Sequence, residues 1–157
     1  MRGLIAAAVA LALLVPEYAD AQRNPPYFAS LGASKARMRT GPGREFPAVW
    51  LYQRAGLPVR VIETYHSWRK IEDPDGATGW MQANLLNYER MAIVTGGIRE
   101  LRAAADPEAA VVWRAEPGVV GRLIECARGW CLLDVKGRNG YVATAHLWGV
   151  TADEKLP

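Results

Sequence analysis

Residues 56–86 read GLPVRVIETYHSWRKIEDPDGATGWMQANLL, and residues 118–147 read GVVGRLIECARGWCLLDVKGRNGYVATAHL. Each stretch follows a second repeated segment, RMRTGPGREFPAVW at 37–50 and ELRAAADPEAAVVW at 100–113. Apolar residues, tryptophans and most glycines match between the copies, whereas charged residues mostly differ. A repeat of this length predicts two copies of one structural unit. The mismatch in charge indicates a shared scaffold rather than a shared reaction centre.

Each copy has the pattern of short β-strands. Residues 59–65 are rich in β-branched and aromatic side chains, which favour strands, and residues 68–73 return after the turn His66-Ser67. This turn predicts a register in which opposite charges and apolar residues face each other. The predicted pairs are Arg60–Asp73, Ile62–Ile71, Glu63–Lys70 and Tyr65–Trp68. Because no stretch has a sustained helical period, we expect an all-β fold.

The motifs in this order resemble those of bacterial SH3-like domains. The stretch 37–50 is similar to the pattern NLRxGPGxxYPVxW that opens such domains, and an Asp-Gly turn, a Gly-Trp pair and a short helical turn follow. The resemblance covers nearly all of residues 22–157 and implies two tandem small SH3-like β-barrels. The second copy has residues 103–105, all alanine, in the region of Gly41-Pro42-Gly43. Since glycine adopts backbone angles that alanine resists, we expect the second loop to have a different shape.

The first 21 residues have the layout of a secretory signal peptide. Arg2 precedes an apolar run at 4–15, and Ala-Asp-Ala at 19–21 supplies small residues for cleavage before Gln22. The run is shorter than the roughly 20 residues that a membrane-spanning helix needs. We expect a periplasmic or secreted protein without stable membrane insertion after cleavage, and an uncleaved anchor is the alternative.

The expected organisation is a signal peptide at 1–21, an N-terminal linker at 22–30, a first SH3-like domain at 31–88, a linker at 89–97, a second SH3-like domain at 98–151 and a tail at 152–157. Units this small are marginal alone. If Arg128-Gly129 is a hairpin turn, Cys126 and Cys131 are opposite each other, with Cα atoms about 4.5 Å apart. This separation allows a disulfide, which export favours over free thiols.

Several function classes are disfavoured. The net charge of +3 is spread without a basic run, which argues against nucleic-acid binding. The C-x4-C spacing is not the C-x-x-C redox motif, and His66 and His146 are too few to complete a metal site with two bonded cysteines. No serine lies in a nucleophile motif. We expect no catalysis, cofactor or metal, although cell-wall peptidases often carry SH3-like appendages, so a cell-wall enzyme is the least favoured alternative.

The tryptophans separate into two groups. Trp50, Trp80 and Trp113 alternate with apolar residues and are expected in the core. Trp68 shares the polar face of its strand, which leaves two readings open: an exposed aromatic patch, or a contact with the second copy. Gln82 and the positions around it lack the proline and tyrosine with which eukaryotic SH3 modules bind proline-rich peptides, so that ligand is not expected.

The first copy retains the glycine loop and an aromatic pair, so we expect ligand contact mainly there. Aromatic rings can stack on sugars or peptides, and basic side chains can donate to carboxylates. The candidate ligand-binding residues are Arg39, Tyr52, Tyr65, Trp68 and Lys70. We expect an exported, non-catalytic binding module for peptidoglycan or an envelope protein. The alternative is a structural accessory protein whose two barrels pack on each other.

Overall fold

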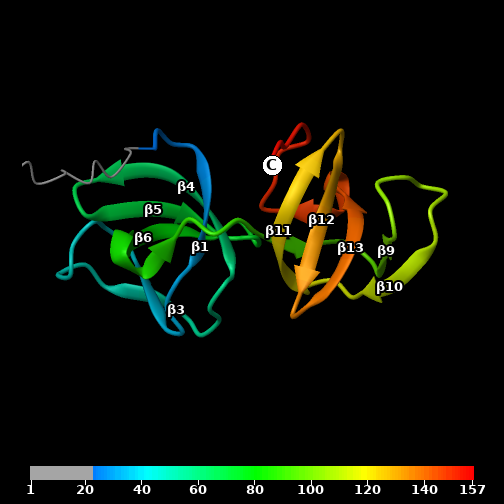
Figure 1. Cartoon of the computed structure of the whole chain (residues 1–157). Helices are drawn as coiled ribbons and strands as arrows, with labels where there is room; N and C mark the ends of the chain where they lie inside the picture. The colour runs from blue at the N-terminus through cyan, green and yellow to red at the C-terminus, as the bar shows by residue number, and fades with distance from the viewer. Residues whose placement is uncertain (1–22) are drawn as a thin grey trace, which may run out of the picture.

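The computed structural model describes residues 23–157, so the expected signal peptide lies outside the described residues. Within this range, the chain forms two antiparallel seven-stranded sheets, one after the other (Figure 1). The strand orders are β3-β2-β6-β5-β4-β1-β7 and β10-β9-β13-β12-β11-β8-β14, so the two repeats have the same topology. The expectation of an all-β fold in two tandem units is confirmed.

The first repeat comprises β1 (Tyr27–Leu31), β2 (Ala36–Arg39), β3 (Ala48–Tyr52), β4 (Pro58–Tyr65), β5 (Trp68–Glu72), β6 (Thr78–Gln82), the 3-10 helix η1 (Ala83–Leu85) and β7 (Leu86–Asn87). The second comprises β8 (Met91–Val94), β9 (Arg99–Arg102), β10 (Val111–Ala115), β11 (Val120–Ala127), β12 (Trp130–Val135), β13 (Arg138–Ala143), the 3-10 helix η2 (Thr144–His146) and β14 (Leu147–Trp148).

Both repeats begin earlier than the sequence analysis places them. β1 pairs with β4 and β7, and β8 pairs with β11 and β14, so both strands belong to sheets although they fall in the stretches 22–30 and 89–97 assigned to linkers. These strands are short and pair with segments distant in the sequence, which leaves no local turn signal. The C-terminal tail also pairs, because the amide and carbonyl of Leu156 bond those of Cys126 at 3.0 and 3.2 Å.

The main hairpin keeps the predicted register only near its turn. Tyr65 pairs with Trp68 and Glu63 with Lys70, as expected. A bulge at Ile62 then shifts the pairing by one residue and places Val61 opposite Ile71. Val61 is fully buried and Ile62 only partly, because an extra residue in one strand turns the following side chains to the other face. The predicted pairs Ile62–Ile71 and Arg60–Asp73 are therefore wrong, and Arg60 instead forms an ion pair with Glu72.

Each repeat has its own apolar core. The core of the first repeat contains Ala29, Leu31, Ala36, Met38, Tyr52, Val59, Val61, Ile71 and Met81. The core of the second contains Ala92, Val94, Leu101, Ala115, Leu123, Cys126, Cys131, Leu133, Val142 and Leu147. The predicted disulfide joins Cys126 to Cys131 within the second core, and their Cα atoms are 4.1 Å apart. Arg128 and Gly129 both have positive φ, as a two-residue hairpin turn requires.

The loops between the second and third strands of each repeat have the same backbone hydrogen bonds, contrary to expectation. In both loops, 40–47 and 103–110, the amide of the first residue donates to the carbonyl of the last, at 3.1 and 2.9 Å. Gly41 is not in the positive-φ region, but a Cβ there would overlap the ring of Phe46. The second loop has Ala104 and Ala109 at these two positions. Gly41 therefore makes room for a ring, and without the ring an alanine fits.

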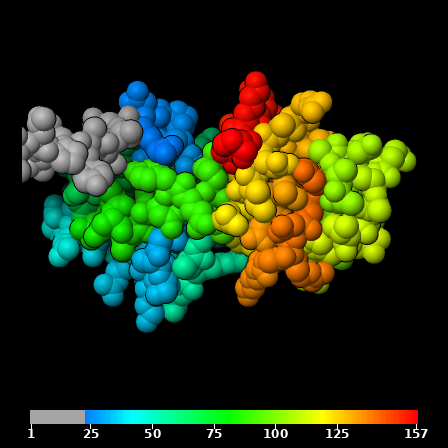
Figure 2. All heavy atoms as spheres, viewed as in Figure 1, coloured from blue at the N-terminus to red at the C-terminus, as the bar shows by residue number. Residues whose placement is uncertain are grey.

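A linker of residues 88–90 joins the two repeats, which also contact each other through side chains. The ring of Phe28 meets that of Trp148 edge-on at 5.5 Å, and the guanidinium of Arg90 lies 5.5 Å from the Phe28 ring centre. The side chain of Arg54 donates to the carbonyl of Gly118 at 2.8 Å. Figure 2 shows the C-terminal tail, in red, at the junction of the two repeats.

Candidate functional site

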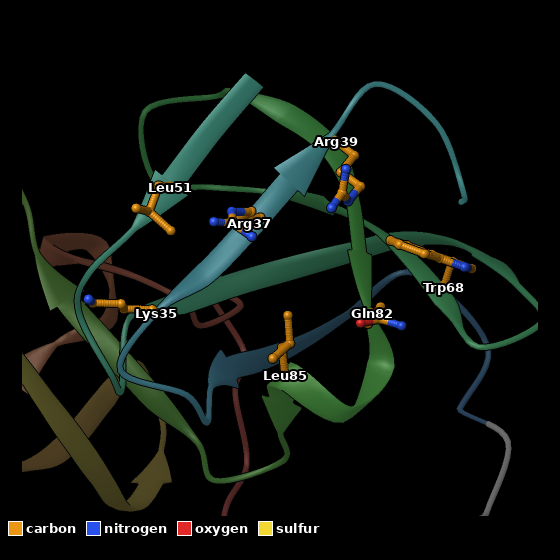
Figure 3. Close-up of a pocket in the computed structure, with 7 residues that line it drawn as sticks. All are labelled: Lys35, Arg37, Arg39, Leu51, Trp68, Gln82 and Leu85. Atoms are coloured by element: carbon orange, nitrogen blue, oxygen red, sulfur yellow. The ribbon is translucent and has the colours of Figure 1, made fainter. Parts of the chain in front are cut away.

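A groove of about 430 Å³ crosses the first repeat at β2. It is lined by Lys35, Arg37, Arg39, Leu51, Trp68, Gln82 and Leu85. Arg37 and Arg39 share one face of β2 because side chains alternate along a strand. Figure 3 shows Lys35 at the opposite end of the groove from Trp68, with Arg37 between them. Among residues 23–157, the lining contains three basic residues and no acidic one.

Trp68 forms one wall of this groove rather than an exposed patch. Its exposed fraction is 8%, so the first of the two alternatives left open by the sequence, an exposed aromatic patch, is wrong. Trp68 is paired with Gln82 across β5 and β6, and the other lining residues also belong to the first repeat. The alternative, a cover formed by the second repeat, therefore does not describe this groove. Alternation along β5 alone does not reveal which neighbouring strands cover each of its faces.

Arg39 lies in the groove but also has a structural role. Its Nη1 donates to the carbonyls of Phe46 at 2.7 Å and Arg44 at 3.2 Å, which holds the 40–47 loop. In the second repeat, the Nη1 of Arg102 makes the equivalent bond to the carbonyl of Ala109, also at 2.7 Å. Because this brace occurs in both repeats, we assign it to the scaffold.

Tyr52 lies in the core, outside the groove. Its exposed fraction is 6%, and its hydroxyl donates to the Oδ2 of Asp73 at 2.8 Å. Burial raises the pKa of Tyr52, and the hydrogen bond and charge of Asp73 raise this pKa further. The hydroxyl therefore stays protonated and serves as a donor to a buried carboxylate.

The remaining two candidates do not line the groove. Tyr65 is 52% exposed and stacks edge-on against His66 at 4.5 Å. The ammonium of Lys70 lies 3.6 Å from a carboxylate oxygen of Glu63. Of the five predicted residues, only Arg39 and Trp68 therefore meet in the groove.

Sequence reasoning missed Lys35, Arg37, Leu51, Gln82 and Leu85 as groove residues. One signal was present, because Lys35, Arg37 and Arg39 alternate with small or apolar residues at the period of a strand. The other three join the groove from β3, β6 and η1, so only the fold brings them together.

Trp50 is also misplaced by the sequence analysis. It is 58% exposed on β3, whereas the expected core residue Trp80 is buried. The equivalent Trp113 is only half-buried, but two side-chain interactions fix its position. Its Nε1 donates to the carbonyl of Asn139 at 3.0 Å, and the guanidinium of Arg138 lies 4.9 Å from its ring centre. The first repeat has alanine where the second has Arg138, so Trp50 lacks that cover.

The second repeat has a smaller groove of about 230 Å³ at the equivalent place. It is lined by Ile98, Arg99, Glu100, Arg102, Trp130, Ala143 and His146. In this groove, carboxylate oxygens of Glu100 lie 2.9 Å from guanidinium nitrogens of both Arg102 and Arg114. Burial lowers the pKa of His146, and the charge of Arg99 lowers this pKa further. Glu100 is therefore paired within the protein, whereas the Nε of Arg99 donates to the carbonyl of Thr95 at 3.0 Å.

Among residues 23–157, no group of His, Cys, Asp or Glu side chains is placed to hold a metal ion. The same residues contain no helix long and apolar enough to cross a membrane.

The repeats match a known family. Residues 32–87 and 97–149 each match the family described as Bacterial SH3 domain, and together they make up well over half of the chain. The chain therefore belongs to the bacterial SH3 domain family, with two tandem copies.

Similarities to individual proteins extend over parts of longer chains. The chain is 27% identical over 129 residues to YrvJ of Bacillus subtilis (strain 168), which is described as a candidate N-acetylmuramoyl-L-alanine amidase. This match covers 71% of the present chain and 24% of YrvJ. It thus spans about a quarter of that relative's length.

Solved structures of NlpC and NlpC/P60 proteins are similar to this chain at low identity. NlpC1 from Trichomonas vaginalis is 9% identical, with a TM-score of 0.36 over 80% of this chain and 46% of that chain. An NlpC/P60 family protein from Bacillus cereus ATCC 10987 is 13% identical, with a TM-score of 0.35 over 77% of this chain and 55% of that chain.

Proposed function

We propose that this protein is an exported, non-catalytic module that binds peptidoglycan through the groove of its first repeat. The observation that carries the proposal is the groove itself, which combines a tryptophan wall, two leucines and a row of basic side chains on a family scaffold. Bacterial SH3 domains typically bind peptidoglycan. Peptidoglycan presents sugars, small apolar side chains and carboxylates, which match this combination of surfaces.

Export is part of the proposal. The layout of residues 1–21 and the disulfide between Cys126 and Cys131 both fit a compartment outside the reducing cytosol. Fractionation of the producing cells tests this point, and recovery of the full-length chain in the cytosol would contradict it.

The second candidate function is a structural accessory protein. The contacts between Phe28 and Trp148 and between Arg54 and Gly118 favour it, because they join the two repeats into one unit. In that case the protein would present a fixed shape to an envelope protein and would not need to bind the cell wall.

Cosedimentation with isolated cell walls separates the two candidates. We expect the protein to sediment with the walls, and L51N to weaken binding about fivefold because about 1 kcal/mol of apolar contact is lost. V49N is the matched control, since Val49 is an exposed apolar residue of the same strand but does not line the groove. Failure of the unmodified protein to sediment, or equal loss of binding in both variants, would refute binding by this groove.

A further inference from the structure

The two grooves are built from equivalent positions of the duplicated fold but differ in charge. Trp130 takes the place of Trp68, Arg102 that of Arg39, and the β13 and η2 residues those of β6 and η1. Two positions account for most of the difference in charge between the grooves. Ile98 occupies the position of Lys35, and Glu100 occupies the position of Arg37.

In the first groove, two positive charges lack an anionic partner in the part of the chain that the structure describes. Within residues 23–157, neither Lys35 nor Arg37 is within ion-pair distance of a carboxylate, and both side chains are exposed. The guanidinium of Arg39 is directed to backbone carbonyls by the loop brace, and it adds a third positive charge beside them. An anion would therefore meet unpaired donors in a groove that already excludes part of the solvent.

In the second groove, the carboxylate of Glu100 is an anion that the protein itself supplies to two arginines. Its two carboxylate oxygens each bind one guanidinium, from Arg102 and Arg114. Loss of the lysine, replaced by Ile98, removes a further donor. In the second groove, the carboxylate that pairs with the arginines therefore comes from the protein itself, whereas the first groove contains no such carboxylate among residues 23–157.

The shape of the first groove favours a carboxylate on a peptide. Leu51, Leu85 and Trp68 give it apolar walls next to the basic row, and Gln82 adds an amide that can donate to or accept from a peptide group. An arginine binds a carboxylate through two parallel hydrogen bonds, which fixes its orientation. A phosphate polymer would instead favour an extended basic surface, whereas here the unpaired charges are confined to one short groove.

We propose that the first repeat recognises a terminal carboxylate of a peptidoglycan stem peptide through Arg37 and Lys35, and that Glu100 makes the second groove unreceptive to the same group. This inference rests on the proposed function for the source of the peptide. Its chemistry can be tested without cell walls.

The test uses a soluble probe, acetyl-Lys-D-Ala-D-Ala, and its C-terminal amide, titrated into the full processed chain and followed by calorimetry. We expect one binding site per chain and at least tenfold weaker binding of the amide. R37Q should weaken binding of the carboxylate probe at least tenfold and leave binding of the amide unchanged, whereas R37K should recover part of the affinity. R44Q is the matched control, because Arg44 is exposed and does not line the groove.

The reciprocal variant tests the second repeat. I98K/E100R gives the second groove the charges of the first, and we expect it to raise the stoichiometry from one to two probe molecules per chain. A circular dichroism spectrum identical to that of the unmodified protein would show that the variant folds.

The outcomes separate this inference from the proposed function. Equal binding of carboxylate and amide, no effect of R37Q, or tighter binding of glycerol phosphate than of the peptide would overturn the carboxylate assignment. If cell walls bind the protein but the soluble probe does not, this inference fails and the proposed function stands. If the probe binds in the expected way but cell walls do not, the inference about chemistry stands and the proposed function fails.

Discussion

At the scale of single residues, Tyr52 and Asp73 show how a polar pair can belong to a core. The carboxylate of Asp73 accepts the Tyr52 hydroxyl at 2.8 Å, and its other oxygen accepts the amides of Asp75 at 3.0 Å and Ala77 at 2.8 Å. The pair thereby connects the buried end of β3 to the turn between β5 and β6. A buried carboxylate depends on such donors.

We expect Y52F to lower the free energy of unfolding by about 1.5–3 kcal/mol, because it removes one hydrogen bond from a buried charged group. Binding of the stem-peptide probe should not change, since Tyr52 does not line the groove. Urea denaturation measures the first effect, with Y65F as the control for loss of an exposed hydroxyl. If Y52F lost probe binding without losing stability, Tyr52 would be a ligand-binding residue, as the sequence analysis predicted.

At the scale of elements, the two equivalent loops have adapted to different side chains. In the first loop the ring of Phe46 occupies the space that a Cβ of Gly41 would need. In the second, Ala104 and Ala109 occupy these positions, and the backbone hydrogen bonds are retained. The loop shape therefore follows from backbone bonding and from the arginine brace, while residue size at the two positions is coupled.

We expect G41A to destabilise the protein by about 1–3 kcal/mol through the steric conflict with Phe46. G41A/F46A should then be more stable than the sum of the two single changes, because the double variant resembles the loop of the second repeat. Denaturation of the two single variants and the double variant completes the cycle. Strict additivity would show that the ring does not limit the size of residue 41.

At the scale of the whole molecule, Arg90 connects the linker, the tail and both repeats. Its Nη1 donates to the Oε1 of Glu154 at 2.8 Å, and its Nη2 donates to the carbonyl of Gly149 at 2.9 Å. Its guanidinium also faces the ring of Phe28 in the first repeat. Glu154 is buried and accepts the amide of Thr151 at 2.9 Å. The C-terminal tail is thus a structural part of the junction.

This arrangement predicts a dependence of stability on pH. Burial alone would raise the pKa of Glu154, but hydrogen bonds from Arg90 and Thr151 and the charge of Arg90 bring the pKa below its usual value of 4.5. The charged form therefore stabilises the folded state at pH values above about 4.5. That contribution is lost as the pH falls through the lower, folded-state pKa.

We expect E154Q to lower the unfolding midpoint at pH 7, and the difference from the unmodified protein to shrink as the pH falls below 4.5. Urea denaturation between pH 7 and pH 3 measures this difference, with E108Q as the control at an exposed site. A difference that stays constant over the whole range would show that ionisation of Glu154 does not contribute.

Much of the architecture could be predicted from local patterns. The duplication, the strand content, the Tyr65–Trp68 end of the hairpin and the Cys126–Cys131 pair all depend on residues close in sequence. The bulge at Ile62 was not visible, because it changes the alternation by one residue without a glycine or proline to mark it. The strands β1 and β8 were missed since their partners lie far along the chain.

The sequence by itself determined that the protein consists of two all-β copies of one unit, because periodic apolar residues and matched turns act locally. The alternation of Lys35, Arg37 and Arg39 is also present in the sequence, although the sequence analysis did not identify it as a groove. Only the tertiary structure decided which side chains share the groove, since Leu51, Trp68 and Leu85 reach it from separate elements. It likewise decided that Tyr52 is buried and Trp50 exposed, because curvature and neighbouring loops determine solvent access at a barrel's surface, and local alternation does not report them.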